Sequence, residues 1–516
     1  MSTTLHISAR GVDLDMLRRP FEGPVQVRLA DEVLARVDRG REVIDAAIAR
    51  GDTIYGVNTG FGKLADRRIS PDDLLELQRR LIVSHMTGVG EPLPDDVVRA
   101  MLLVKLACLV QGHSGVRRDV VLALQALINA DVLPVVPSQG SVGASGDLAP
   151  LSHMAAVLTG QGRVRVRGEE TDALSGLEIA GVSPLVLGPK EGVALINGTQ
   201  ASTALALRAL FAAEAVFNAA VAAGALSLEA VAGRPAALDP RIQRIRRQHG
   251  QIRVAAALRR LVEDSPILAE EFPGRRLQDP YCMRCQPQVM GAAFDLMQFA
   301  ADILLREANS VSDNPLIFPD EAEILSGGNF HGQPVAYAAD IIALALCEIG
   351  SLSERRTAML NDTGMSGLPP FLVKDAGLNC GYQLAQVTSA ALVAENRALA
   401  APNSVDSIPT SAGQEDHVSM ATHASRRVHR MAVNAAYVVA VELLCAAQGV
   451  DLRAEGRTAP GTRPVYDLVR AEAPYLDADR VLAPEMEAVQ SLVLGGAFLT
   501  HGDVRYADEA GTEDGR

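Results

Sequence analysis

The sequence has no tryptophan, and aromatic residues make up only 4% of its 516 residues. Alanine and leucine supply most of its apolar side chains instead. These two residues have high helix propensities, whereas β-branched residues lose side-chain freedom in a helix. The composition therefore predicts a chain that is mostly helical.

Basic side chains are too few to balance the acidic ones. The chain has 48 lysine and arginine residues against 62 aspartate and glutamate residues, which gives a formal net charge of −14. Proteins that bind nucleic acids or anionic membrane surfaces use clusters of basic residues to contact phosphate groups. We therefore expect neither a nucleic acid nor a membrane surface among the partners of this protein.

Uninterrupted apolar runs are short. The charge-free run near the middle of the chain, residues 215–228, lies between Glu214 and Glu229. It is shorter than the roughly 20 residues that a transmembrane helix needs. The N-terminal residues, MSTTLHISARGVDLD, contain no basic segment followed by an apolar one, as a signal peptide would. We expect a cytoplasmic protein without a membrane span.

Cysteine is scarce, with six scattered residues. Cys282 and Cys285 have the C-x-x-C spacing of metal ligands, but the other cysteines form no second pair. A structural zinc site needs four ligands, usually from two such pairs. The sequence therefore predicts reduced thiols and no metal site, as is usual in cytosolic proteins.

Apolar residues recur at helical spacing through much of the chain. They do so within residues 31–50, and Ser70-Pro71 is a typical helix start, with a capping serine before a proline. Residues 190–234 contain no proline, which predicts one or two long helices buried on all sides. Only residues 4–8 resemble a strand. Three further segments have the same helical character: 286–312, 340–361 and 383–400.

These helices predict an all-α fold, in which a bundle of long central helices is surrounded by others. A small irregular part is expected near the N-terminus. We expect an N-terminal region at residues 1–200 and a central bundle with C-terminal helices at residues 201–502. The acidic tail at residues 503–516 is expected to fray.

One short stretch suggests chemistry. Residues 144–146 read Ala-Ser-Gly within GSVGASGDLAP. In a tight bend, the unhindered amide nitrogen of Gly146 can attack the carbonyl carbon of Ala144 and close a five-membered ring with loss of water. Loss of the Ser145 hydroxyl as a second water then leaves an exocyclic methylidene, which is a strong electrophile. Gly143 and Gly146 permit the bend.

The surroundings of this tripeptide favour such chemistry over two others. Pro150 suits the first turn of a helix, whose positive N-terminal end would stabilise negative charge at the tripeptide. The G-x-S-x-G elbow of serine hydrolases does not match, because Asp147 replaces the second glycine. A phosphate-binding loop would need Gly-Lys-Ser/Thr, which is missing. An ordinary glycine-rich turn is the remaining alternative.

Longer motifs at several points of the chain, within residues 55–448, strengthen the chemical interpretation. The chain resembles the histidine and phenylalanine ammonia-lyase family in these segments. They are YGVNTGFG (55–62), GSVGASGDLAPLSHM (140–154), EGVALINGTQ (191–200), QDPYCMRCQPQ (278–288), NSVSDNPL (309–316), GGNFHGQP (327–334) and SVDSIPTSAGQEDHVSM (404–420). Agreement in so many independent segments makes chance a poor explanation.

The resemblance implies an all-α fold of the ammonia-lyase/fumarase-like type, with long and near-parallel central helices. It implies a homotetramer whose active sites take residues from several chains. It also implies that Ala144, Ser145 and Gly146 form 4-methylidene-imidazol-5-one (MIO), the electrophile of the family, so that no dissociable cofactor is needed.

The family removes ammonia from an α-amino acid and leaves an α,β-unsaturated acid, which requires a base for the β-proton. The resemblance assigns this role to Tyr55, at the start of a loop whose three glycines would let it close as a lid. A free phenol ionises near pH 10 or so, so the site must favour the ionised form. Tyr281 is the second tyrosine of the family site, and Glu415 is a third candidate for proton transfer.

The resemblance also names residues that bind the substrate. Arg284 fits the substrate carboxylate, which a guanidinium group holds in a bidentate fork. Asn197 and Gln278 are expected to donate hydrogen bonds around the carboxylate and the MIO carbonyl. Phe330 is expected to line the pocket beside MIO.

Two features point to the substrate. Histidine enzymes of the family resemble Ser84-His85, where phenylalanine enzymes have Phe-Leu and tyrosine enzymes have His-Leu. The carboxylate of Glu415 suits an imidazole, whereas phenylalanine and tyrosine enzymes more often have Gln-Asp-Val in that segment. The resemblance therefore implies that L-histidine is converted to trans-urocanate and ammonia, the entry step of histidine degradation.

Other interpretations stay open at this point. Tyrosine aminomutases also carry Ser-His, and Met86-Thr87 and Cys282-Met283 differ from the residues expected there. A tyrosine or phenylalanine ammonia-lyase or a 2,3-aminomutase is therefore the main alternative. A helical scaffold without catalytic activity is disfavoured because the tripeptide, both tyrosines and Arg284 are intact.

Overall fold

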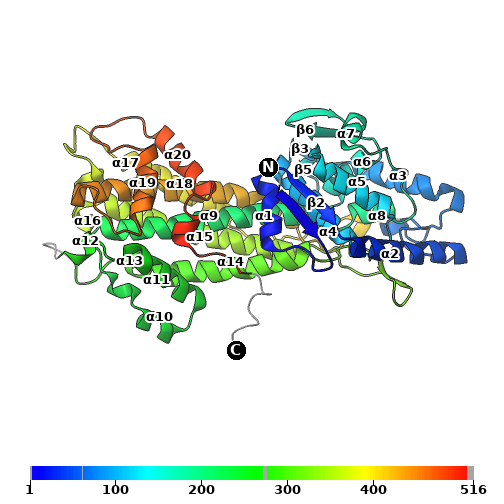
Figure 1. Ribbon diagram of the computed structural model, residues 1–516, viewed down its shortest axis with the longest axis horizontal. Helices are drawn as coiled ribbons and strands as arrows, with labels where there is room; N and C mark the ends of the chain where they lie inside the picture. The colour runs from blue at the N-terminus through cyan, green and yellow to red at the C-terminus, as the bar shows by residue number, and fades with distance from the viewer. Residues whose placement is uncertain (1–2, 61, 271–275, 508–516) are drawn as a thin grey trace. The chain divides into compact units, whose positions relative to one another are not determined.

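The computed structural model describes residues 3–60, 62–270 and 276–507, and it confirms the predicted all-α class (Figure 1). The described residues form two compact units. The first unit lies within Met1–Arg208, Ala301–Asp340 and Pro402–Arg426, and the second within Ala209–Ala300, Ile341–Ala401 and Arg427–Arg516. The predicted boundary near residue 200 did not anticipate that two later segments join the N-terminal region, because composition suggests only contiguous domains.

In the part of the chain that the structure describes, eight short or medium-length helices belong to the first unit. One of them, α2, covers the segment at residues 31–50 that periodicity predicts. The helices are α1 (Leu14–Glu22), α2 (Asp31–Arg50), α3 (Leu74–His85), α4 (Asp95–Leu109), α5 (Arg118–Asn129), α6 (Leu148–Leu158), α7 (Ala173–Ala180) and α8 (Glu191–Ile196).

Strands are more frequent than the sequence predicts. The expected strand is present as β1 (Thr3–Ile7), which pairs in parallel with β2 (Val25–Leu29). The other pairs are antiparallel, and their strands have only three or four residues, which is too short for a reliable prediction even where β6 alternates as RVRV. They are β3 (Val89–Pro92) with β5 (Pro137–Gln139), β4 (Val132–Pro134) with β6 (Arg163–Val166), β6 with β7 (Glu169–Asp172), and β8 (Leu316–Phe318) with β9 (Glu323–Leu325).

Four long helices contribute residues to both units: α9 (Gln200–Ala230), α14 (Gln286–Ala308), α15 (Gln333–Asn361) and α18 (Ala421–Ala454). By length and composition alone, each is long and apolar enough to cross a membrane. The lengths of the uninterrupted apolar runs in the sequence do not indicate this. In α9 and α18, however, 94% and 89% of the apolar window is buried inside the protein. Such burial is typical of central helices in a bundle.

The remaining helices of the second unit lie between the long helices along the chain or after them. One of them, α17, matches the segment predicted at residues 383–400. They are α10 (Pro240–Arg246), α11 (His249–Val262), α12 (Pro266–Ala269), α13 (Tyr281–Arg284), α16 (Thr363–Ser366), α17 (Gln383–Leu399), α19 (Arg463–Glu472), α20 (Ala483–Leu494) and α21 (Leu499–Gly502). Short 3₁₀ helices complete the described chain: η1 (Gly62–Leu64), η2 (Pro71–Asp73), η3 (Pro235–Leu238), η4 (Pro370–Leu372) and η5 (Ser411–Gly413).

The beginning of the expected acidic tail is packed. Val504 is buried, and its backbone exchanges two hydrogen bonds of 2.9 Å with the side chain of Asn218 on α9. The tail therefore stays with the second unit as far as residue 507. The fraying predicted for residues 508–516 lies outside the described residues.

A fully buried ion pair joins α15 to α18 in the core of the second unit. The guanidinium of Arg356 donates from Nε and Nη2 to the two carboxylate oxygens of Glu442, at 2.5 and 2.7 Å. Ser227 and Ser353 donate to the same carboxylate, at 2.8 and 2.6 Å. Burying two charges is tolerable here because each carboxylate oxygen of Glu442 has two donors.

Replacing one partner of this pair is expected to destabilise the protein strongly. In Arg356→Met, the carboxylate of Glu442 stays buried without its counter-charge, and the expected cost is about 3–5 kcal/mol. Thermal unfolding followed by circular dichroism measures the change. Arg430→Met is the control, because Arg430 pairs with Glu395 at the surface and its loss should leave the unfolding temperature nearly unchanged.

Candidate active site

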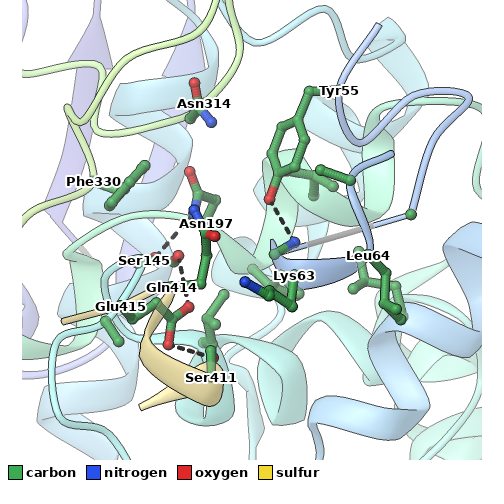
Figure 2. A pocket seen from close by; sticks show the side chains of 18 of the residues that line it. Tyr55, Lys63, Leu64, Ser145, Asn197, Asn314, Phe330, Ser411, Gln414 and Glu415 are labelled. Carbon is green, nitrogen blue, oxygen red and sulfur yellow. Dashed lines mark hydrogen bonds between the residues drawn. The ribbon is translucent and has the colours of Figure 1, made fainter. Parts of the chain in front are cut away.

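A cavity of about 1150 Å³ lies in the first unit, and residues from several separate loops and helix ends line it (Figure 2). Eight of the residues singled out from the sequence meet there. They are Tyr55, Ser84, His85, Ala144, Ser145, Asn197, Phe330 and Glu415. The segments that carry them are far apart in the chain, so the fold creates this grouping.

The tripeptide lies in the loop between β5 and α6, and its backbone is sharply bent. Gly143, Ser145 and Gly146 all have positive φ angles, of 76°, 53° and 77°. This conformation is common for glycine but costly for a residue with a side chain such as Ser145. The helix α6 begins at Leu148, which places Pro150 in its first turn, as predicted.

Close contact with a second glycine fixes this bend. Gly146 pairs with Gly198, just after α8, in an isolated parallel bridge, and the amide of Asp147 donates to the Gly198 carbonyl at 2.7 Å. A Cβ atom on Gly146 would lie only 2.1 Å from the carbonyl oxygen of Gly198. No other residue type fits at this position unless the backbone moves.

Two donors face the carbonyl oxygen of Ser145. The side-chain amide of Asn197 donates to it at 3.0 Å, and the backbone N–H of Gly198 lies at 3.4 Å. Asn197 is buried and follows the last residue of α8. Preorganised donors of this kind stabilise negative charge on an oxygen, as in an oxyanion hole.

A buried carboxylate supports the tripeptide from its C-terminal side. Asp147 accepts hydrogen bonds from the backbone and hydroxyl groups of Ser202, and from the hydroxyl groups of Thr422 and Ser141, at 2.7–3.3 Å. Burial raises the pKa of the Asp147 carboxyl, and these donors oppose that effect. The contact with Thr422 ties the tripeptide to the start of α18.

The loop that carries Tyr55 folds back on itself. The backbone N–H of Gly62 donates to the phenolic oxygen of Tyr55 at 3.1 Å (Figure 2). Gly60 and Arg67 are joined by a backbone hydrogen bond, as are Asn58 and Ile69. These contacts hold Tyr55 at the cavity. Phe61, within the same motif, lies outside the described residues.

The last turn of α3 presents His85 to the cavity with a defined tautomer. Its Nδ1 atom lies 2.8 Å from the carbonyl oxygen of Leu81, which can only accept a hydrogen bond. Nδ1 therefore carries a proton, and Nε2 of the neutral ring is an acceptor. The hydroxyl of Ser84 donates to the same carbonyl at 3.0 Å, so both side chains are oriented by the helix itself.

Glu415 is fixed by the loop at η5. One carboxylate oxygen accepts from the hydroxyl groups of Thr410 and Ser411, at 2.8 and 2.6 Å. The other accepts from the hydroxyl of Ser145 at 3.4 Å, so Glu415 contacts the residue that would lose its hydroxyl (Figure 2). Phe330 lines the cavity from the loop between β9 and α15.

Three expected site residues belong to the second unit and do not line this cavity. Gln278 is exposed, and Tyr281 and Arg284 begin and end the single turn of α13. The side chain of Tyr281 is 69% exposed, and the guanidinium of Arg284 lies 4.7 Å from the centre of its ring. Within the second unit, the exposed ring of Tyr281 therefore lies against the partly buried guanidinium of Arg284.

The cavity also contains polar residues that the sequence analysis did not single out. Most of them lie within a motif or next to one, whereas Arg67 and Arg80 lie outside the motifs and carried no signal. They are Lys63, Arg67, Arg80, Asn314, Ser326, His331, Ser411, Gln414, Asp416 and His417. Lys63 directly follows YGVNTGFG, and His417 lies two residues after Glu415.

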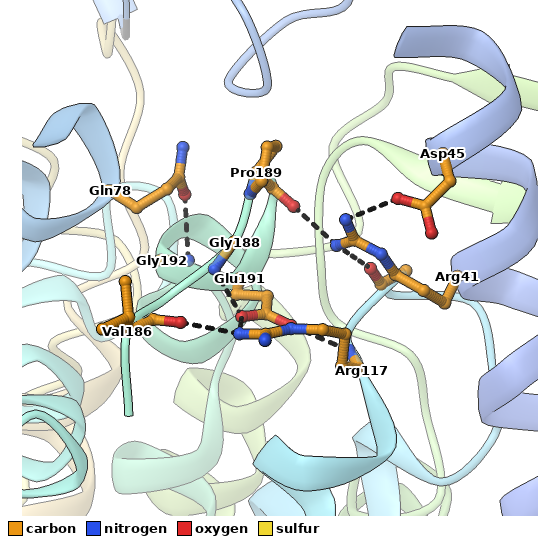
Figure 3. A network of polar contacts seen from close by, with 10 residues as sticks. Arg41, Asp45, Gln78, Arg117, Val186, Gly188, Pro189, Glu191 and Gly192 are labelled. Carbon is orange, nitrogen blue, oxygen red and sulfur yellow. Dashed lines mark hydrogen bonds and ion pairs between the residues drawn. The ribbon is translucent and has the colours of Figure 1, made fainter. Parts of the chain in front are cut away.

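An ion pair between the buried Glu191 and the partly exposed Arg117 anchors α8, the helix that precedes Asn197 (Figure 3). Glu191, the first residue of α8, accepts from Nε and Nη2 of Arg117 at 2.8 and 2.7 Å, and from the backbone N–H of Gly188 at 2.6 Å. The next amide, of Gly192, donates to Gln78 on α3 at 2.9 Å. These contacts fix α8, and with it Asn197, against α3 and the start of α5.

A sequence profile of aromatic amino acid lyases matches residues 12–471. The chain belongs to this family. A histidine ammonia-lyase from Burkholderia cenocepacia is 53% identical over 496 residues, which cover 96% of this chain and 98% of the relative. Lyases of this family depend in general on MIO.

Solved structures of family members agree with the fold. The crystal structure of histidine ammonia-lyase from Trypanosoma cruzi is 39% identical, with a TM-score of 0.90 over 98% of this chain and 96% of that chain. Tyrosine aminomutase from Streptomyces globisporus is 34% identical, with a TM-score of 0.92 over 99% of this chain and the whole of the other. The family fold therefore extends over nearly the entire chain.

Proposed function

We propose that this protein eliminates ammonia from L-histidine and releases trans-urocanate. The observation that carries the proposal is the meeting of His85 and Glu415 with the Ala-Ser-Gly tripeptide in one cavity. The Burkholderia and Trypanosoma relatives, which are named histidine ammonia-lyases, support the same substrate. The amino acid is bound as a small molecule, without a nucleic acid or a metal.

We further propose that Ala144, Ser145 and Gly146 form MIO in this chain. The residues fit this group, because the backbone is bent at Ser145 and a side chain at position 146 would clash with Gly198. Asn197 and Gly198 would hold its carbonyl oxygen, which is that of Ser145. Once formed, the group supplies an electrophilic carbon that makes the substrate's amino group a better leaving group.

In this proposal, Asn197 and the amide of Gly198 stabilise negative charge on the Ser145 carbonyl oxygen. When a nucleophile adds at the position of the Ser145 side chain, negative charge reaches the Ser145 carbonyl oxygen. The two donors already point at that oxygen, so little reorganisation is needed. The positive N-terminal end of α6 adds to this stabilisation.

Tyr55 is proposed to remove the β-proton of the substrate. The Gly62 amide that donates to its phenolic oxygen supports negative charge there. Closure of the glycine-containing loop would exclude water from the cavity. We propose that Tyr281, Arg284 and Gln278 reach the cavity from another chain of a cytoplasmic homotetramer, where Arg284 binds the substrate carboxylate.

His85 and Glu415 are proposed to hold the imidazole of the substrate. The Nδ1 proton of His85 is used by Leu81, so Nε2 is available to accept an N–H from the substrate. The carboxylate of Glu415 is the second acceptor and also favours a protonated imidazole. Tyr55, Tyr281 and Glu415 are proposed to share the proton transfers of the reaction.

A second candidate function keeps the tripeptide and changes the outcome. The tyrosine aminomutase from Streptomyces globisporus and a phenylalanine aminomutase from Pantoea agglomerans have closely similar structures, with TM-scores of 0.92 and 0.91. An aminomutase returns ammonia to the β-carbon and yields a β-amino acid. The two functions therefore differ in whether free ammonia is released.

A substrate comparison tests the proposed function. Purified protein is incubated with L-histidine, L-tyrosine and L-phenylalanine separately, and the near-ultraviolet band of each conjugated acid is followed together with ammonia. We expect urocanate and ammonia in equal amounts from histidine only. Turnover of an aromatic substrate instead, or a β-amino acid without ammonia, would contradict the assignment.

Gly146→Ala is expected to prevent ring formation, because the added Cβ collides with the Gly198 carbonyl. Mass spectrometry of the intact chain measures this directly. Wild-type protein should be lighter than its sequence by two waters, whereas the variant should keep the full mass. Gly168→Ala is the matched control, because Gly168 has a φ of +85° but no neighbour within 4 Å of an added Cβ.

Glu415→Gln and His85→Leu are expected to impair histidine turnover more than ring formation. Glu415→Gln removes the negative charge beside the imidazole and His85→Leu removes the acceptor Nε2. Loss of a hydrogen bond to a charged group costs about 1.5–3 kcal/mol, or roughly 10- to 100-fold in rate. Steady-state kinetics and the intact mass of the same samples separate the two effects. Normal kcat/KM in both variants would show that neither side chain binds the substrate.

A further inference from the structure

Lys105 is a fully buried lysine that the proposed reaction does not use. It lies in α4, among apolar neighbours that are themselves buried. Its Nζ atom donates to the carbonyl oxygens of Ala194 and Asn197, at 3.0 and 2.8 Å. Within the described part of the chain, no ion pair joins Lys105 to a carboxylate, although buried lysines are rarely found without one.

The peptide bond between Asn197 and Gly198 connects this lysine to the tripeptide. The carbonyl of that peptide accepts from Lys105 at 2.8 Å. The N–H of the same peptide faces the carbonyl oxygen of Ser145 at 3.4 Å, and the Asn197 side chain donates to that oxygen at 3.0 Å. One peptide group therefore lies between the buried amine and the oxygen that would gain negative charge.

Hydrogen bonds in series strengthen one another. A donor at a peptide carbonyl polarises that peptide, and its N–H becomes a better donor on the other side, particularly in a low-dielectric interior. The same contact also prevents the peptide from rotating, because two carbonyls at the end of α8 share one amine. Both effects act on the donors that face Ser145.

We propose that Lys105 is a positioning residue for the reaction, which fixes and polarises the Asn197–Gly198 peptide so that its donors stabilise negative charge on the Ser145 carbonyl oxygen. This inference rests on the proposed function. It assigns a role to a side chain that does not touch the cavity and that acts only through the peptide between them.

The charges around Lys105 are arranged to tolerate it. Burial lowers the pKa of the Lys105 amine, and the effects of Cys108, Asp313 and Asp147 oppose this, whereas Lys190 adds to it. Lys190 itself is paired with Asp313 at 2.7 Å. The ammonium and the neutral amine both have enough protons for two carbonyls, so the geometry holds in either state.

A purely structural role is the competing explanation, since lysine side chains often satisfy the last carbonyls of a helix. Both explanations predict a less stable protein when Lys105 is replaced. Only the proposed role predicts a slower reaction in chains that have folded and formed the electrophile. The test therefore compares rates per processed chain.

The variant is Lys105→Met, which keeps the length and removes the donors. Cys108→Ala is the control, because it disturbs the packing of the same buried helix and keeps the two hydrogen bonds that Lys105 donates. The fraction of processed chains is taken from the intact mass. We expect kcat for histidine per processed chain to fall about 10-fold in Lys105→Met, with KM nearly unchanged, and to stay within about twofold of wild type in Cys108→Ala.

A second readout avoids the substrate altogether. Sodium borohydride delivers a hydride to the methylidene carbon at position 145, water supplies the proton, and the chain gains two hydrogen atoms, which mass spectrometry follows with time. Hydride addition also sends negative charge to the Ser145 carbonyl, so it should slow about 10-fold in Lys105→Met. If the methionine variant does not fold, Lys105→Gln is compared with wild type in the same way.

The outcomes separate the two proposals. Wild-type rates of both reactions per processed chain in the Lys105 variant would overturn the role of Lys105 and leave the proposed function intact. A wild-type protein that reacts with borohydride but yields no urocanate from histidine would overturn the substrate assignment, while the borohydride rates would still decide the role of Lys105. A wild-type chain with its full sequence mass would overturn both.

Discussion

The contact between Gly146 and Gly198 is the constraint on which the rest of the site depends. Their backbones approach so closely that neither a Cβ on Gly146 nor a shifted α8 is tolerated. Everything that fixes α8, including Glu191 with Arg117 and the amide of Gly192 with Gln78, therefore also fixes the tripeptide. Through these polar contacts, the packing of the helices in the first unit determines the position of the Ser145 carbonyl oxygen.

Much of the fold could be predicted from the sequence, and the exceptions have physical causes. Long helices such as α9 follow from the absence of proline and the abundance of alanine and leucine. The short strands were missed because segments of three to five residues give a weak pattern, even where β2 and β6 alternate between apolar and polar residues. The composition of the two units was missed because residues 301–340 and 402–426 return to the first unit through tertiary packing, which leaves no local signal.

The candidate site was predictable where residues lie in motifs. Tyr55, Asn197 and Glu415 were named from such segments, and the fold brings all three to one cavity. Their hydrogen bonds were not predictable, because the tautomer of His85 and the bend at Ser145 depend on backbone atoms. No sequence pattern singled out Lys105, because a single lysine in a helix is usually interpreted as a solvent-exposed residue.

The composition of the first unit has a consequence for protein synthesis. The tripeptide leaves the ribosome early, but Glu415, which contacts Ser145, and Thr422, which contacts Asp147, are translated hundreds of residues later. A nascent chain that ends before residue 402 lacks the whole third segment of the unit. The proposed electrophile thus acquires its complete surroundings only after residue 422 has been made, and a chain that ends earlier lacks them.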